Sequence, residues 1–364
     1  MGDDVQWKKA EKPQIIQNVL GHPQLRPLID DWERREPDPR IRSSLNDKLA
    51  RLSPDRPFWV AALLFDLYQN PETLPSYCKT VADQRSEEEA SNEIFQEALP
   101  HYFRLQKVST VSNTPKVEKQ ANLAIRMIAS LLSDVQLVSV YLALRIQKLE
   151  WPEPLDDEEK QQSAWINLYV DAPLASRIGI FWIKSELEDR AFQILQPEQY
   201  ADLKRLVARK RDQRRMLVDK TLQEIQKMLQ EAGLKHQVQG RYKRFYSIFE
   251  KLKRVDDDFE KIHDLTGFRV LVEHVRDCFT ALSYIHERWI PIDDRYKDYI
   301  SQPKPNGYQS LHTTVLNDEG EPLEIQIRTQ EMHRVAENGF AAHWLYKSSS
   351  DSPHSPGAVS YTHL

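Results

Sequence analysis

The sequence predicts an all-helical first half followed by a smaller α/β domain with a mixed sheet. Apolar residues in the first half follow helical spacing or fill whole segments, and only ten glycines occur in 364 residues. From His236 the pattern changes to short strand-like segments between helices. We expect a helical domain over 1–195, a connecting helix over 196–233, an α/β domain over 234–347 and a linker or non-native tail over 348–364.

The overall composition is that of a cytoplasmic globular protein. Hydrophobic residues make up 40% of the chain and charged residues 29%, and the net charge is -5. No apolar run approaches the roughly 20 residues that span a bilayer, and no secretory pattern is present. We therefore expect no membrane partner. Cys78 and Cys278 lie too far apart in the sequence to suggest a disulfide framework or a metal site.

Three segments of the first half predict buried helices. Residues 58–68 are apolar nearly all round, and 121–133 and 135–149 repeat this character. Asp134 stands between the last two segments as a plausible N-cap. Residues 165–189 also have helical spacing, with a break near a proline.

A long helix is predicted to start at Pro197 and to stop at Gly233. The segment 204–254 contains sixteen Lys and Arg residues and only five Asp and Glu residues. The basic run at 209–215 fits a nucleic-acid patch, but a solvated helical face is the commoner structure for such a run.

The predicted α/β domain alternates short strands and helices. We expect strands over 237–240, 267–272, 309–316 and 322–328, helices over 243–254, 275–289 and 330–346, a helical turn over 259–265 and a hairpin turn at 318–320.

Basic and hydroxyl side chains are spaced to share one face of the predicted helix 243–254. Lys243, Ser247 and Lys251 stand at i, i+4 and i+8. Such a row near a helix N-terminus suits a polyphosphate, although an ordinary solvated face fits this segment equally well.

Two carboxylates are candidates for a metal site. Asp264 stands at the mouth of the strand that carries Arg269, and Glu324 alternates with apolar residues in a later strand. A metal on a polyphosphate takes one or two protein carboxylates, which these two residues could supply from neighbouring strands. Each residue alone is more commonly a cap or an exposed strand carboxylate.

The segment 295–312 combines cations, an Asn-Gly turn and an isolated aromatic residue. Tyr308 follows Asn306 and Gly307, where an aromatic ring is commonly exposed and can stack on a base. His312 lies on the strand that follows, and such a histidine is more often structural. The basic residues of this segment are Arg295, Lys297 and Lys304.

Together, these clusters closely resemble the synthetase domain of the RelA/SpoT family, the long alarmone synthetases that make (p)ppGpp in the stringent response. The similarity runs from about 172 to 347 and includes the segments 172–179 and 182–189. The resemblance implies a nucleotidyltransferase-like fold and a GTP/GDP diphosphokinase, which transfers pyrophosphate from ATP to the 3′-hydroxyl of GDP or GTP with Mg²⁺.

The resemblance also implies a role for each matching residue. Asp264 binds Mg²⁺, and Glu324 shares the metal or takes the proton from the 3′-hydroxyl. The implied ATP-binding residues are Arg241, Lys243, Ser247, Lys251 and Arg269, and the implied GDP/GTP-binding residues are Arg295, Lys297, Lys304, Asn306, Tyr308 and His312. Relatives sense uncharged tRNA on the ribosome through a C-terminal region, and we expect the same of a longer parent of this chain.

The first half resembles the family's HD-type hydrolase but lacks its chemistry. Phe65 stands where the family has a His ligand, and Gln69 and Asn70 replace two carboxylates. Residues 142–148 lack the family's later Asp and Asn. A lone Asp66 cannot hold a transition metal, which predicts an inactive, degenerate hydrolase domain. The basic segment 295–298 is instead typical of bifunctional relatives, which have hydrolase activity. The missing metal ligands are the stronger evidence, so we still expect an inactive hydrolase domain.

Two alternatives stay open. A relative of the same fold could pyrophosphorylate tRNA 3′ ends, aided by the basic run 209–215. A non-catalytic nucleotide sensor would normally have lost Asp264 or Glu324, and this chain keeps both.

Overall fold

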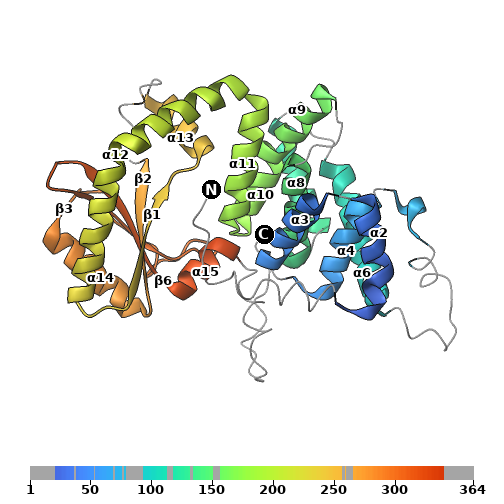
Figure 1. The fold of residues 1–364 in the computed structure, drawn as a ribbon, viewed down its shortest axis with the longest axis horizontal. Helices are drawn as coiled ribbons and strands as arrows, with labels where there is room; N and C mark the ends of the chain where they lie inside the picture. The colour runs from blue at the N-terminus through green and yellow to red at the C-terminus, as the bar shows by residue number, and fades with distance from the viewer. Residues whose placement is uncertain are drawn as a thin grey trace. The chain divides into compact units, whose positions relative to one another are not determined.

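The computed structural model describes residues 21–36, 38–52, 54–68, 70–75, 78, 93–112, 118–131, 134–150, 156–255, 259 and 265–339 (Figure 1). Of these, the residues up to Leu187 form one compact unit and Glu188–Gly339 form a second. The domain boundaries expected at 195, 233 and 347 stay predictions.

The first unit is helical throughout its described residues, as predicted. Its α-helices are α2 (Arg26–Arg35), α3 (Pro39–Leu52), α4 (Arg56–Leu67), α6 (Glu93–Ser112), α7 (Glu118–Leu131), α8 (Val135–Glu150), α9 (Asp157–Ile166) and α10 (Ala172–Arg177), with short 3-10 turns at Pro23–Leu25 and Pro71–Thr73.

Helices α4 and α8 form the interior of this unit, and α8 also packs against α3. Almost every residue of α8 is buried, which explains why 135–149 is apolar nearly all round. Asp134 caps α8 as predicted, because its carboxylate accepts the Gln136 N–H at 2.7 Å.

The predicted helix 165–189 is divided in the structure. A π-helix, Asn167–Asp171, follows α9, and α11 (Phe181–Leu195) starts after Gly179, whose φ of +82° ends α10. The break that the sequence predicted near Pro173 is therefore a change of helix type followed by a turn.

The second unit is built on a mixed sheet. Its strands are β1 (His236–Tyr242), β2 (Thr266–Val272), β3 (Ile290–Pro291), β4 (Lys297–Asp298), β5 (Leu311–Leu316) and β6 (Pro322–Thr329). The order is β1-β2-β6-β5-β3, with β4 also on β5. Only β2 and β6 pair in parallel among the described strands, so the predicted mixed sheet is confirmed.

One face of this sheet carries the core. The long α12 (Pro197–Glu231) and α14 (Val275–Arg288) bring Ile225, Leu229 and Ile285 against Val270 and Ile325 (Figure 1). The predicted end of the long helix is confirmed, since α12 stops just before Gly233, whose φ is +68°.

Two predicted helices have different bounds. The segment predicted as 243–254 is α13 (Phe245–Leu252) followed by a 3-10 turn, Lys253–Val255. The segment predicted as 330–346 is described as α15 (Gln330–Asn338). The turn predicted over 259–265 lies mostly outside the described residues. No helix within the described ranges is both long and apolar enough to cross a membrane.

Candidate active site

The second face of the sheet is polar, and it contains five of the predicted site residues, Arg241, Arg269, Glu324, His312 and Lys297. Successive side chains of a strand alternate between faces, so Phe268 and Ile325 enter the core while their neighbours face the other way. Strand register places two rows side by side on this polar face: Arg241, Gly267, Glu324 and Thr314, and then Gln239, Arg269, Gln326, His312 and Lys297.

Glu324 lies near the middle of the first row. Its Oε2 is 2.9 Å from Lys243 Nζ, and the two side chains are 24% and 21% exposed. The Gln326 Nε2 also reaches Glu324 Oε1 at 3.4 Å. Gly267 lies between Glu324 and Arg241 and has no side chain. The carboxylate therefore borders an open position on the sheet.

Lys243 does not lie on the helix where the sequence placed it. Its backbone N–H donates to the Leu265 carbonyl at 2.9 Å, which continues the path of β1, and α13 starts only at Phe245. The predicted single helical row of Lys243, Ser247 and Lys251 is therefore wrong. Ser247 and Lys251 remain one turn apart on α13, while Lys243 faces Glu324 across the sheet.

The α13 N-terminus is fixed by Asp189, whose Oδ1 accepts the Tyr246 N–H at 2.8 Å. Aromatic rings hold the helix in place, with the Phe192 and Phe249 rings stacked at 4.4 Å. This packing fixes the position of Ser247 and Lys251 relative to α11.

An aromatic cluster lies beside the second row. The rings of Tyr299, Tyr308 and His312 meet at centroid distances of 5.4 to 6.0 Å, and Lys304 Nζ lies 4.5 Å from the Tyr299 ring and 5.3 Å from the Tyr308 ring. Such a cluster offers aromatic faces and an ammonium group to a flat, anionic ligand. Tyr299 was not among the predicted site residues, and only its spacing from Tyr308 could have indicated it.

His312 is held neutral in this cluster. The Tyr308 hydroxyl and His312 Nε2 are 2.7 Å apart, and burial lowers the pKa of the imidazole to about 4. The turn before Tyr308 is the predicted one: Gly307 has a φ of +74°, and the Asn306 side chain accepts the Tyr308 N–H at 3.3 Å. Arg295 and Lys297 lie next to the cluster in sequence, and both are exposed.

A buried charge cluster underlies the polar face. It consists of Arg269 on β2, Arg328 on β6, and His333 and Glu337 on α15. Glu337 Oε1 lies 3.4 Å from Arg269 Nη2 and 3.3 Å from Arg328 Nη2, and Arg328 Nη2 also donates to His333 Nδ1 at 2.6 Å. Arg328, His333 and Glu337 were missed from the sequence, although Arg328 continues the alternation of Glu324 and Gln326.

Burial and neighbouring charges shift the protonation of this cluster. Burial, followed by the charge of Arg328, lowers the pKa of Arg269 to about 9. Burial and the same guanidinium lower the pKa of His333 to about 3. The pKa of Glu337 falls to about 2 although burial opposes this change, because Arg269 and Arg328 stabilise the carboxylate. His333 is thus neutral and Glu337 ionised at neutral pH.

The chemistry of Glu324 fits a hard cation such as Mg²⁺. A Mg²⁺ ion bound to a polyphosphate needs only one or two protein carboxylates, and Glu324 presents its carboxylate at the partly open face. The second predicted ligand, Asp264, lies outside the described residues. Among the described residues, no group of three or more His, Cys, Asp and Glu side chains forms a complete metal site.

Comparison with known proteins places both halves of the chain. Residues 240–351 match the family described as the region found in RelA / SpoT proteins. Residues 42–181 match the HD domain family. Residues 42–351 are thus similar to proteins of the RelA/SpoT family.

Several relatives in this family are similar over most of the chain. A GTP pyrophosphokinase of Myxococcus xanthus is 39% identical over 272 residues, 74% of this chain and 36% of the relative. The bifunctional (p)ppGpp synthase/hydrolase RelA of Mycobacterium tuberculosis is 43% identical over 61% of this chain and 30% of its own. The chain thus spans about a third of these relatives.

A solved structure is similar over part of the chain. The small alarmone synthetase 1 of Bacillus subtilis, bound to its product pppGpp, is 27% identical to this chain. The match covers 40% of this chain and 82% of that one, with a TM-score of 0.31.

Within the HD region, positions predicted to have lost their ligands have structural roles: Asn70 is exposed and caps the Pro71–Thr73 turn, and others take part in packing. Phe65 is half-buried on α4, and Asp66 accepts the Trp32 indole N–H at 3.3 Å. On α8, Arg145 forms a buried ion pair with Asp171 at 2.8 Å, and the Tyr141 hydroxyl donates to the same carboxylate. Gln69 lies outside the described residues.

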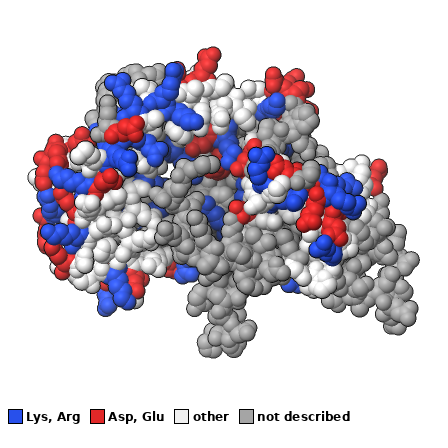
Figure 2. Space-filling view, viewed as in Figure 1, with Lys and Arg blue, Asp and Glu red and all other residues white. Residues whose placement is uncertain are grey.

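The basic run on α12 is largely engaged within the second unit. Lys210 is buried over the Phe259 ring at 5.2 Å, Arg211 stacks 3.7 Å from the Tyr242 ring centroid, and Arg214 pairs with Glu321 at 2.9 Å. Figure 2 shows Lys and Arg gathered over α12 and α13. Part of this patch is therefore structural.

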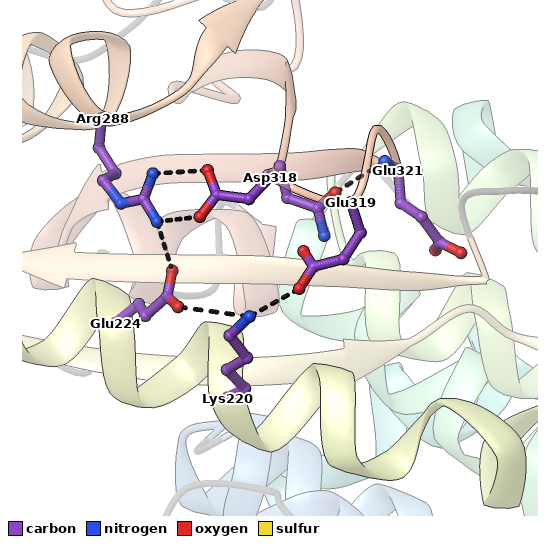
Figure 3. Close-up of polar contacts among 7 residues, drawn as sticks. Lys220, Glu224, Arg288, Asp318, Glu319 and Glu321 are labelled. Carbon is purple, nitrogen blue, oxygen red and sulfur yellow. Dashed lines mark hydrogen bonds and ion pairs between the residues drawn. The ribbon is translucent and has the colours of Figure 1, made fainter.

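An exposed ionic network ties the β5–β6 hairpin to α12 and α14 (Figure 3). Arg288 binds both carboxylate oxygens of Asp318, at 2.8 and 2.5 Å, and lies 3.5 Å from Glu224. Lys220 lies 2.6 Å from Glu319 and 4.0 Å from Glu224. The network holds the turn that leads into β6, the strand of Glu324. Gly320 has a φ of +75° there, which confirms the predicted hairpin turn.

Proposed function

We propose that this chain is a (p)ppGpp synthetase, which transfers pyrophosphate from ATP to the 3′-hydroxyl of GDP or GTP. The observation that carries the proposal is the position of Glu324. Its carboxylate borders an open position at Gly267 and lies beside Lys243. The cluster of Tyr308, His312 and Lys304 is close by, because His312 pairs with Gln326, two residues after Glu324 on β6. The names of the similar relatives, GTP pyrophosphokinase and (p)ppGpp synthase, support the same reaction.

The two nucleotides would approach this face from different sides. Arg241, Lys243, Ser247 and Arg269 lie on β1, α13 and β2, where they would bind ATP and neutralise its phosphates. The aromatic cluster lies toward β4 and β5, where Tyr308 would stack on guanine.

The transfer itself needs a base and charge neutralisation. The ribose 3′-oxygen forms a bond to the β-phosphorus of ATP, the bond from that phosphorus to the bridging oxygen of the α-phosphate breaks, and AMP leaves. Glu324 takes the proton of the 3′-hydroxyl. Lys243 binds Glu324 at 2.9 Å in the free chain, and phosphate would draw the ammonium group away and release the carboxylate. Bound Mg²⁺, held by Glu324 and Asp264, would supply further neutralisation of phosphate charge.

The test is transfer from labelled ATP to GDP, GTP or deacylated tRNA, separated by chromatography. We expect a labelled guanosine product from the wild-type chain. Glu324→Gln should abolish transfer while ATP still binds, because the amide keeps the shape but accepts no proton. Glu319→Gln, in the exposed hairpin, is the matched control and should retain wild-type rate. Absence of any guanosine product from the wild-type chain would refute the proposal, and near wild-type transfer by Glu324→Gln would remove this residue from the mechanism.

We also propose that the HD domain is inactive as a hydrolase. A metal-dependent hydrolase needs imidazole and carboxylate ligands, whereas Phe65 offers none and Asp66 accepts a hydrogen bond from Trp32. Some relatives are named as hydrolases, including one of Aquifex aeolicus that is 34% identical over 334 residues. Because the ligands are missing in this chain, incubation with Mn²⁺ and ppGpp should release no pyrophosphate. Release of pyrophosphate would show that metal ligands lie elsewhere in the chain.

The tRNA-acceptor alternative is less well supported than synthesis of (p)ppGpp. Lys210, Arg211 and Arg214 contact Phe259, Tyr242 and Glu321, although Arg211 stays exposed, as Arg209 and Arg215 do. The deacylated tRNA arm of the assay decides between the two acceptors. Control by uncharged tRNA on the ribosome stays a prediction.

A further inference from the structure

Helix α15 follows β6 without a loop and lies against β2 and β6. Thr329 is the last residue of β6 and also the N-cap of α15, since its side chain accepts the Met332 N–H at 3.1 Å. His333 and Glu337 stand one turn apart on this helix. Glu337 therefore contacts Arg269 and Arg328, whose side chains project from the polar face of the sheet.

The charges in this cluster do not balance. Two guanidinium groups, 8% and 2% exposed, share the carboxylate of Glu337. His333 cannot add a charge, because its Nδ1 accepts from Arg328 and must be unprotonated. Arg269 Nε and Arg328 Nε have no hydrogen-bond partner among the described residues, and Arg269 Nη2 has only its ion-pair contact with Glu337 at 3.4 Å. Buried N–H groups without partners are costly, so an anionic or polar ligand that reached them would relieve this cost.

We propose that Glu337 is a positioning residue that orients the Arg269 guanidinium toward the adenine nucleotide. This inference rests on the proposed function, in which Arg269 contacts ATP. Glu337 is the one carboxylate within ion-pair distance of Arg269 in the described part of the chain. It leaves Arg269 Nε without a partner, whereas a fully paired guanidinium would have none to offer. His333 takes one N–H of Arg328, so that Arg328 depends less on Glu337.

The experiment compares Glu337→Gln with Glu331→Gln in the whole chain. Glu331 lies on the same helix, is exposed and pairs only with Arg334 among the described contacts. We expect Glu337→Gln to raise KM for ATP roughly 10- to 100-fold, as loss of a supporting residue commonly does. KM for the guanosine nucleotide should stay unchanged, and Glu331→Gln should match wild type. Equal changes in both KM values, or none, would overturn the proposal.

Two further variants separate positioning from folding. Glu337→Asp keeps the charge and should recover part of the ATP affinity, which a loss of helix packing would not allow. Arg269→Lys combined with Glu337→Gln should cost no more than Arg269→Lys alone, because both act on one guanidinium. Additive losses would show that Glu337 acts elsewhere.

The pH profile gives an independent readout. The groups that face Arg269 are Arg241 from β1, Arg328 from β6, His333 and Glu337 from α15, and Tyr308. Removing the carboxylate leaves mainly cations, so the proton of Arg269 is lost at lower pH. The alkaline limb of ATP binding should therefore move to lower pH in Glu337→Gln, and an unmoved limb would contradict the role.

Binding of a non-hydrolysable ATP analogue, measured by calorimetry, separates this inference from the proposed function. If the wild-type chain binds the analogue but makes no guanosine product, the proposed function fails while Glu337 can still be tested. If Glu337→Gln binds the analogue as wild type does, the positioning role fails even when synthesis is confirmed.

Discussion

The two charge clusters of the second unit differ in burial, and this difference indicates what each can do. The exposed network of Arg288, Lys220 and the hairpin carboxylates contains matched partners in water (Figure 3). The cluster of Arg269, Arg328 and Glu337 is buried and carries an excess cation. Water and salt screen the first, whereas loss of Glu337 leaves two uncompensated buried cations in the second.

The two clusters also differ in their roles, since the exposed network stabilises a turn and the buried cluster belongs to the proposed binding site. The exposed network fixes the turn before β6, and a loss there can be made up by solvent. The buried cluster leaves Arg269 Nε without a hydrogen-bond partner among the described residues. Among the described residues, the excess positive charge is therefore found where the proposed ligand is an anion.

The largest effect on stability should come from removing the shared carboxylate. Glu337→Ala leaves two buried guanidinium groups together and should cost about 3–5 kcal/mol. Arg328→Met leaves one cation and one carboxylate with similar volume, and should cost less than about 1.5 kcal/mol. Hydrogen exchange of the β2 and β6 amides measures both. Equal costs would mean that charge imbalance does not govern the cluster.

Acid should have an intermediate effect through the two neutral histidines. Their pKa values fall from the usual 6.5 to about 4 for His312 and about 3 for His333. As pH falls from 6.5 toward 4, the unfolded chain binds protons that the folded chain does not, so stability is lost. Each histidine contributes at most about 1.4 kcal/mol per pH unit. His333→Gln should flatten the dependence of β6 amide protection on pH, and an unchanged slope would contradict these shifts.

The smallest effect should come from the exposed network. Arg288→Gln removes both bonds to Asp318 and the contact with Glu224. It should lower the thermal midpoint slightly at low salt and not at all near 1 M salt, because exposed pairs are screened. A loss that persists at high salt would show that the hairpin depends on this network more than its exposure implies.

The sequence predicted those elements in which the spacing of apolar residues reflects which side chains are buried. The α4, α8 and α12 helices and the β2 and β6 strands lie close to the expected bounds, because each has a consistent apolar face. It also placed Glu324, Tyr308 and His312 on the strands and turn where they are found.

The errors concern contacts between distant segments. Lys243 was placed on a helix because its spacing from Ser247 is helical, but its N–H is taken by Leu265 and its ammonium group by Glu324, 81 residues away. The pairing of Glu337 with Arg269 is likewise set by the return of α15 over the sheet. No local pattern encodes that return.

The direct passage from β6 into α15 makes the two proposed functional carboxylates a single rigid segment. Glu324 and Glu337 are joined by a strand and a helix that share Thr329, with no residue to absorb a change in length. One residue inserted after Thr329 would turn the helix by about 100° and carry Glu337 away from Arg269. The exposed β5–β6 turn can tolerate an insertion, whereas the junction of β6 and α15 cannot. The spacing between Glu324 and Glu337 must therefore be kept.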